Sequence, residues 1–164
     1  MNKNKLKIMT LTGVFTAIVF IFTAYLHIPS HIGYVHVGDG FIYLAACLLP
    51  APYAVFVGSV GALLADGLTG YLIWAPASVV IKGLSVFCFK KTAKIMSARN
   101  LLGLVPASLI SVFGYYFYEG LITGNFLEPL FCIHLNIIQA VLSSALFIFL
   151  AYSSDKMGLK EKIL

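Results

Sequence analysis

A single lysine, Lys82, stands inside an apolar segment that runs from Trp74 to Phe89. If this segment crosses a membrane, an unpaired lysine there costs at least about 2.5–3.5 kcal/mol on insertion scales. Two compatible roles would compensate for that cost. Lys82 could form a structural ion pair with Asp66, at the end of the preceding apolar segment, or it could line a polar cavity and donate a hydrogen bond to a ligand.

Polar residues also recur along one face of the last apolar segment. Cys132, Asn136, Gln139 and Ser143 are spaced by three and four residues, which places them on one stripe of a helix. The Asn136 amide presents a donor and an acceptor together, an arrangement that suits the edge of a heterocycle. The same amide could instead hydrogen-bond between helices, a contact worth about 0.6 kcal/mol.

Aromatic residues stand near these polar groups. Tyr71 and Trp74 follow a glycine-rich turn and offer flat apolar faces with polar tips. Tyr115 belongs to a tyrosine cluster that could equally form an interfacial belt. Glu119, four residues further on, lies just within an apolar segment, where a carboxylate is costly. Together these residues predict a site for an aromatic nitrogen heterocycle, with stacking faces and polar edges.

The sequence shows no pattern for catalysis, metal binding or cofactor binding. The histidines of the first loop, His27, His31 and His36, lie outside the predicted helices, so they lack i,i+4 placement on a helix face, and they have no nearby cysteine. No HExxH motif, Walker loop, dinucleotide-binding glycine motif or plausible Ser/His/Asp set is present. We therefore expect no metal, no cofactor and no enzymatic activity.

The composition identifies lipid as the solvent of this chain. Hydrophobic residues make up 60% of the 164 residues and charged residues only 10%, with a mean hydropathy of +0.97. A soluble domain of this size could not hide so much apolar surface. We therefore predict an all-α membrane protein, one domain over residues 1–164, with six transmembrane helices. The expected spans are Ile8–Leu26, Gly40–Leu49, Tyr53–Ala65, Trp74–Phe89, Leu101–Ile122 and Leu130–Ala151.

The basic residues predict how these helices are oriented. With an internal N-terminus, ten of the eleven basic residues fall in cytoplasmic segments, Lys82 being the exception. Both termini are then cytoplasmic, and the net charge of +5 reflects membrane orientation rather than nucleic-acid binding. This topology needs a hairpin at Pro50–Pro52. A kink there would merge two spans and place the basic cluster at 90–100 outside.

The polarity of the chain is concentrated at the predicted outer end. All four histidines and four of the six acidic residues map to outer loops or outer helix ends. The chain is short for a complete transporter with inverted repeats. A small bundle with an outward polar pocket favours ligand capture rather than complete transport.

Three segments carry a family resemblance. They are GYVHVGD at 33–39, LADGLTGY at 64–71 and IKGL at 81–84. In order and spacing they resemble the S components of energy-coupling factor (ECF) transporters. The resemblance is nearest to the branch for hydroxymethylpyrimidine, pyridoxine and riboflavin-type vitamins, and to a related branch linked with queuosine precursors.

This resemblance implies a high-affinity binding subunit in the bacterial cytoplasmic membrane. Such subunits join a transmembrane coupling protein (T component) and two cytoplasmic ATPases, and they hold a vitamin near the outer face. The matching regions of this sequence include His36, Tyr71, Trp74, Lys82, Tyr115, Glu119 and Asn136. Family members also pack the first helix on the coupling protein through an Ala-x-x-x-Ala pattern. The matching residues here are Gly13 and Ala17, which remain small.

Two other classes of membrane protein compete with this interpretation. A small membrane enzyme or assembly factor would need a nucleophile or an acid–base pair, and the histidines and acids are too scattered to assign such roles. A self-assembling channel should show a polar face along an entire helix. Here the polarity is mostly confined to the outer half, which favours a closed pocket.

Overall fold

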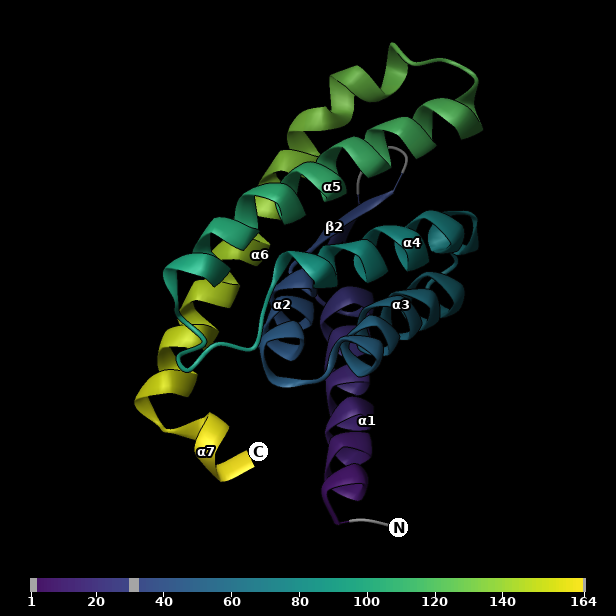
Figure 1. The fold of residues 1–164 in the computed structure, drawn as a ribbon. Helices are drawn as coiled ribbons and strands as arrows, with labels where there is room; N and C mark the ends of the chain where they lie inside the picture. The colour runs from purple at the N-terminus through teal and green to yellow at the C-terminus, as the bar shows by residue number, and fades with distance from the viewer. Residues whose placement is uncertain (1–2, 30–32, 164) are drawn as a thin grey trace.

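The computed structural model describes residues 3–29 and 33–163, and it is mainly helical (Figure 1), which confirms the predicted all-α class. The helices are α1 Lys3–Ala24, α2 Asp39–Leu48, α3 Ala51–Leu68, α4 Ala75–Ser85, α5 Ala98–Thr123, α6 Glu128–Lys156 and α7 Leu159–Ile163. Single 3₁₀ turns at Leu72–Trp74 and Val86–Cys88 extend α4 at both ends. Two three-residue strands, β1 His27–Pro29 and β2 Tyr34–His36, pair antiparallel, with His27 opposite His36.

Four of these helices are long and apolar enough to cross a membrane, namely α1, α3, α5 and α6. The segments Asp39–Leu48 and Leu72–Cys88 are apolar but shorter. With 10 residues, α2 rises about 15 Å, roughly half the thickness of a bilayer's hydrocarbon core. The described helices cover each of the six segments that hydropathy selects, although α2 is too short to cross alone.

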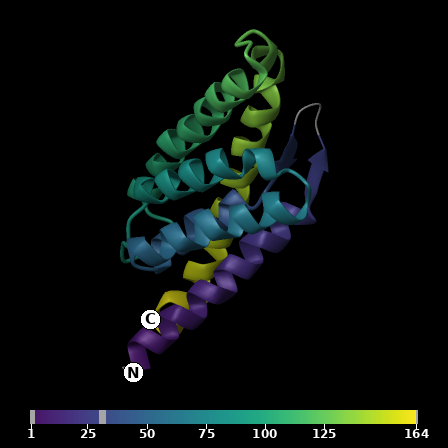
Figure 2. The same ribbon diagram turned by 90° about the vertical axis from the view of Figure 1, so that its right-hand side faces the viewer.

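The short helix α2 lies in the middle of the bundle. It packs against α1, α3 and α6, and nine of its ten residues are buried. The other helices pack as neighbours around it, α1 on α3, α3 on α4, α4 on α5 and α5 on α6 (Figures 1 and 2). On α2 itself, the ring of Tyr43 stacks on Phe89 at 4.7 Å between centroids, and both rings contact Phe147.

Prolines and glycines set the ends of the helices. α2 and α3 are separate helices joined at Leu49 and Pro50, and proline also stands in the first turn of α3, α4 and α6, where its missing N–H costs nothing. Gly124 ends α5 with a φ of 69°, which a side chain would strain.

The β hairpin is held against α1 by a close approach at Gly38. A Cβ at this position would lie 2.1 Å from Thr23 Oγ1 on α1, so only glycine fits. The hairpin lies away from the two termini, which share the opposite end of the molecule (Figures 1 and 2). The chain therefore turns from α1 into α2 through a hairpin that covers the buried helix.

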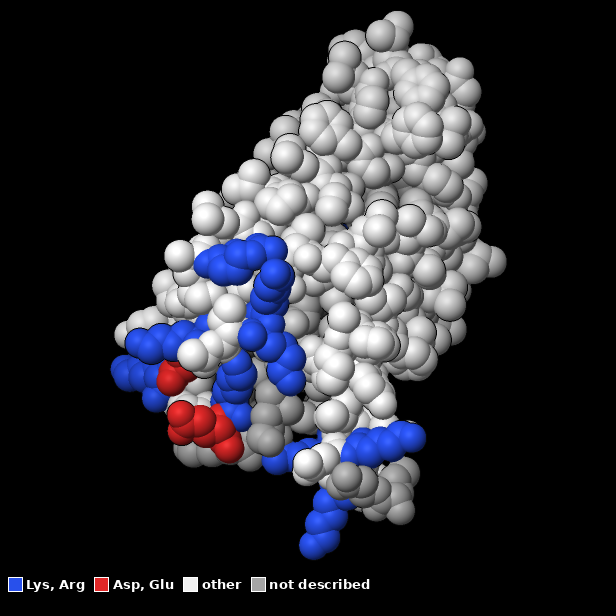
Figure 3. All heavy atoms as spheres, viewed as in Figure 1, with Lys and Arg blue, Asp and Glu red and all other residues white. Residues whose placement is uncertain are grey.

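Charge is segregated along the molecule. Basic side chains gather at the end where the termini lie, and the rest of the visible face carries no charge (Figure 3). The exposed basic residues are Lys3, Lys5, Lys7, Lys90, Lys91, Lys94, Arg99 and Lys156. Lys82 is the basic residue that is buried among those described, with 2% of its surface exposed.

Lys82 is neutralised by Asp39 rather than by the expected partner, Asp66. Lys82 Nζ donates to Asp39 Oδ2 at 2.8 Å, which ties α4 to the N-terminus of α2. Gln139 on α6 donates to the same oxygen at 3.4 Å. Asp66 instead accepts a hydrogen bond from Tyr34 of the hairpin. The sequence favours Asp66 as the partner because it ends the apolar segment that precedes the segment of Lys82. Folding instead brings the first turn of α2, with Asp39, against α4.

We predict that Lys82→Met lowers the free energy of unfolding by about 3–5 kcal/mol, because it leaves the Asp39 carboxylate buried without a cation. Adding Asp39→Asn to the same chain should restore part of this loss, since the double variant no longer buries a charge. Thermal and denaturant unfolding of detergent-purified protein, followed by circular dichroism, measures both changes.

The matched control is Lys82→Met combined with Asp66→Asn. If that pair rescues stability as well as the pair with Asp39→Asn does, the ion pair assigned above is wrong. Unchanged stability of Lys82→Met alone would contradict it as well.

Candidate functional site

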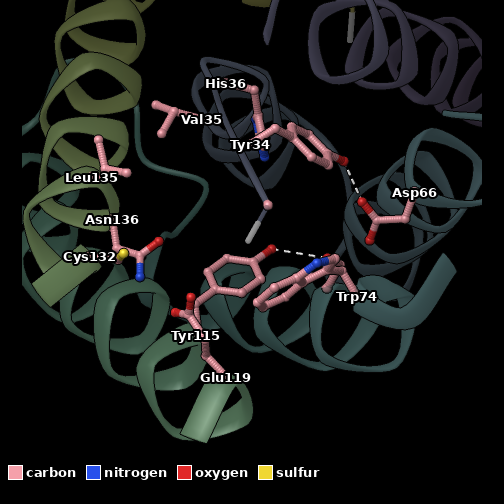
Figure 4. Close-up of a pocket in the computed structure, with 12 residues that line it drawn as sticks. Tyr34, Val35, His36, Asp66, Trp74, Tyr115, Glu119, Cys132, Leu135 and Asn136 are labelled. Carbon is pink, nitrogen blue, oxygen red and sulfur yellow. Dashed lines mark hydrogen bonds between the residues drawn. The ribbon is translucent and has the colours of Figure 1, made fainter. Parts of the chain in front are cut away.

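A cavity lies between the β hairpin and the helices α4, α5 and α6 (Figure 4). The space between its walls is about 490 Å³, including the open mouth. Its lining combines aromatic rings, carboxylates and an amide with few aliphatic groups. The lining residues are Gly33, Tyr34, Val35, His36, Asp66, Trp74, Ser78, Tyr115, Glu119, Cys132, Leu135 and Asn136.

One wall is aromatic and comes from α4 and α5. The rings of Trp74 and Tyr115 lie edge to face, 6.2 Å apart between centroids. Ser78, one helical turn after Trp74, shares a hydrogen bond of 3.0 Å with the hydroxyl of Tyr115. This bond joins α4 to α5 and holds the Tyr115 ring beside Trp74 (Figure 4).

The hairpin forms a second wall through Tyr34 and His36. Alternate residues of a strand face the same side, so both side chains turn towards the bundle. The Tyr34 hydroxyl donates to Asp66 Oδ1 at the end of α3. Burial, and then the charge of Asp66, raises the pKa of Tyr34 well above its usual range, so the phenol keeps the proton that it donates.

His36 is buried and held as a neutral ring. Its Nδ1 accepts a hydrogen bond from the backbone N–H of Gly38 at 3.1 Å, which assigns the ring proton to Nε2. Its own backbone N–H donates to Gln139 Oε1 at 3.3 Å. Burial lowers the pKa of His36 to about 4, although the charge of Asp39 acts in the opposite direction. The hairpin is thereby tied to the Lys82–Asp39–Gln139 network.

The third wall is polar and comes from α5 and α6. Figure 4 shows the Glu119 carboxylate, the Asn136 amide and the Cys132 thiol grouped across the cavity from Asp66. Glu119 is 5% exposed. The cavity therefore has aromatic faces and polar groups on two of its sides, which suits a flat ring with polar edges.

Most of the site residues predicted from the sequence come together here. His36, Trp74, Tyr115, Glu119 and Asn136 line the cavity. Tyr71 lies behind the hairpin wall, with its ring 4.7 Å from that of Tyr34. Lys82 lies beneath the cavity, with Nζ 4.8 Å from the centroid of the Tyr115 ring. His31 of the predicted histidine-rich loop lies outside the described residues.

The sequence interpretation did not select several of the lining residues as candidates. Ser78 stands midway between Trp74 and Lys82 at a spacing of four, so a helical-face count would have found it. Tyr34 is two residues from His36, and strand alternation would have paired them. Cys132 belongs to the polar stripe with Asn136, whereas Leu135 carries no chemical signal.

The neutral His36 predicts a pH dependence of stability. The unfolded chain binds a proton near pH 6.5, and the folded chain binds it only near pH 4. The free energy of unfolding should therefore be at its full value above pH 6.5 and fall as the pH falls towards 4, by up to about 3 kcal/mol. Thermal unfolding of purified protein across this range measures the slope.

His36→Gln should remove much of this slope, because the variant binds no proton at that position. His134→Gln, which changes an exposed histidine on α6, is the matched control and should retain the slope. Equal slopes in the two variants would contradict a buried neutral His36.

Comparison with known families gives a match over most of the chain. The family described as "ECF-type riboflavin transporter, S component" matches residues 3–154. A comparison with curated proteins found no match.

Proposed function

Because the chain belongs to the family of ECF-type riboflavin transporter S components, we propose that the cavity beneath the hairpin captures a water-soluble vitamin or a related aromatic nitrogen heterocycle. The chain is thus a multi-pass membrane protein and the substrate-binding subunit of an ECF importer. The proposed ligands include hydroxymethylpyrimidine, pyridoxine and compounds of similar size, with queuosine precursors as a further group.

The composition of the cavity is the observation that carries this proposal. Trp74 and Tyr115 offer ring faces to a flat molecule, while Glu119 and Asn136 offer polar groups at its edge. The Asn136 amide makes no hydrogen bond to the described part of the chain, so its donor and acceptor are free for a ligand. Tyr71 supports the hairpin wall from behind, and Lys82 supports Tyr115 from beneath.

The charge distribution supports a six-span topology with cytoplasmic termini. The basic end of the molecule carries both termini (Figures 1 and 3), whereas the hairpin that lines the cavity lies away from that end. By the positive-inside rule the basic end faces the cytoplasm. The cavity then opens outwards, where a substrate arrives. The T component and the ATPases with which S components work meet the basic end.

The first helix offers a surface for the coupling protein. Thr12, Thr16 and Val19 are buried on the side of α1 that packs on α3. Gly13 and Ala17 are exposed, and a Cβ at Gly13 would meet no atom within 4 Å. Small residues four apart permit close helix packing in lipid. We propose that this pair docks against the T component.

We predict that the purified protein alone binds one heterocycle with a Kd well below 1 mM, without ATP, because the site lies within this subunit. Trp74 is the single tryptophan of the chain and lines the cavity, so its fluorescence should change when the site fills. Titration with pyridoxine, hydroxymethylpyrimidine, riboflavin and a queuosine precursor, checked by calorimetry, identifies the ligand.

Asn136→Ala should weaken this binding by about tenfold, or 1.4 kcal/mol. Asn125→Ala removes an exposed amide from the connection between α5 and α6 and is the matched control. If no vitamin or nucleobase precursor binds better than millimolar, or if the two variants behave alike, the capture site proposed above is wrong.

Gly13→Leu combined with Ala17→Leu should abolish uptake in cells and co-purification of the T component, yet leave ligand affinity within about threefold. The leucines would hold the two helix backbones apart, while the substituted face does not pack on α3. Val14→Leu changes an exposed residue on the adjacent face and should leave transport intact.

Normal transport by the double variant would exclude docking at this pair. Combined loss of folding and ligand binding would instead assign Gly13 and Ala17 to the internal packing of the bundle.

A further inference from the structure

Two carboxylates face the proposed ligand cavity, and among the described residues 3–29 and 33–163 no positively charged side chain lines it. Asp66 comes from the end of α3 and Glu119 from α5, and Figure 4 shows them on opposite sides of the cavity. From this arrangement we propose that the site selects a positively charged ligand, an aromatic ring bearing a protonated amine, and rejects anionic ligands. This inference rests on the capture function proposed above and adds the charge of the substrate.

Both carboxylates have unused hydrogen-bonding capacity. Asp66 is 2% exposed, and its Oδ1 accepts from Tyr34 while its Oδ2 is buried with no hydrogen-bond partner. The Glu119 carboxylate, 5% exposed, receives no hydrogen bond from the described part of the chain. Buried carboxylate oxygens that accept no hydrogen bond are unfavourable. A ligand with a positive charge and N–H donors would provide the missing hydrogen bonds to these oxygens.

The nearest cation of the protein cannot satisfy them. Lys82 Nζ is bound to Asp39 at 2.8 Å beneath the Tyr115 ring, and this pair is electrically neutral as a unit. His36, the other basic group on the cavity wall, is kept neutral by burial. Any charge on the described lining is therefore negative and belongs to its two carboxyl groups, whose ionised form a cationic ligand would favour.

The aromatic wall favours the same kind of ligand. The faces of Trp74, Tyr115 and Tyr34 carry partial negative charge, which attracts a cation within about 6 Å of a ring centroid. Lys82 already occupies such a position against Tyr115. A cationic ring between these faces would be held by stacking and by electrostatic attraction at once.

An anionic ligand would meet the opposite situation. A carboxylate or phosphate would lie beside two carboxyl groups that repel it whenever they are ionised, and Lys82 could reach it only by leaving Asp39. That exchange would bury Asp39 without its partner, which is strongly unfavourable in a bundle that lies within lipid. The pairing of Lys82 with Asp39 thus withholds from an anion the cation nearest to the described cavity lining.

Three forms of one ring system test this charge preference. Pyridoxamine, pyridoxine and 4-pyridoxic acid share a ring and differ at one substituent, which is a protonated aminomethyl, a hydroxymethyl or a carboxylate. Their affinities for detergent-purified protein are measured by Trp74 fluorescence and calorimetry. We expect pyridoxamine to bind at least about tenfold more tightly than pyridoxine, and 4-pyridoxic acid to bind most weakly.

Charge-removing variants of similar shape assign the preference to the two carboxylates. Glu119→Gln and Asp66→Asn should each reduce the ratio of pyridoxamine to pyridoxine affinity by about tenfold. Glu161→Gln removes the same charge from an exposed position on α7 and should leave the ratio unchanged. Thermal unfolding shows whether each variant is folded. If Asp66→Asn does not fold, the affinity ratio of Glu119→Gln alone decides the outcome.

The outcomes separate the two proposals. Equal affinity for pyridoxamine and pyridoxine, tightest binding of the acid, or an unchanged ratio in both carboxylate variants would overturn charge selection while leaving the capture function intact. Charge selection is also wrong if none of the three binds and a neutral or anionic compound from the vitamin titration does. If no compound of either set binds, the capture function itself is wrong and the charge preference falls with it.

Discussion

The buried ion pair of Lys82 and Asp39 is the interaction on which the rest of the structure depends. In a protein whose solvent is lipid, a lysine on α4 is tolerable only with a partner, and that partner begins α2. The ion pair fixes the position of the first turn of α2 along α4. A hydrogen bond from Gln139 to Asp39 ties the same turn to α6. Since α2 is only 10 residues long, the space beyond this pair is filled by the hairpin instead of by helix.

The character of the cavity follows from the same pair. Because Lys82 is paired with Asp39, its charge is not available to the cavity, whose described polar side chains include Asp66, Glu119 and Asn136. The hairpin is positioned by His36, whose backbone reaches Gln139 and whose ring is fixed by Gly38. A change in the Lys82–Asp39–Gln139 network would therefore move the hairpin wall of the cavity. This coupling joins the stability of the bundle to the shape of the site.

The two faces of the first helix differ in how they pack. One face packs on α3, where Gly61 lies so close that a Cβ would meet Val19 at 2.7 Å. The other face exposes Gly13 and Ala17, with no described neighbour to justify such small residues. The proposed docking of the T component on this second face would leave the packing of α1 on α3 undisturbed.

The sequence by itself determined the lipid solvent, the helical class, the position of every main helix and five of the twelve residues that line the cavity. Hydropathy and helical spacing are local properties, so Trp74, Glu119 and Asn136 could be selected without a structure. The partner of Lys82 was decided only by the tertiary structure. Asp39 is 43 residues away along the chain, and the contact exists because a short central helix starts where α4 passes. Tyr34 joins the cavity for the same reason, since the packing of the hairpin on α6 is a long-range contact that no local pattern encodes.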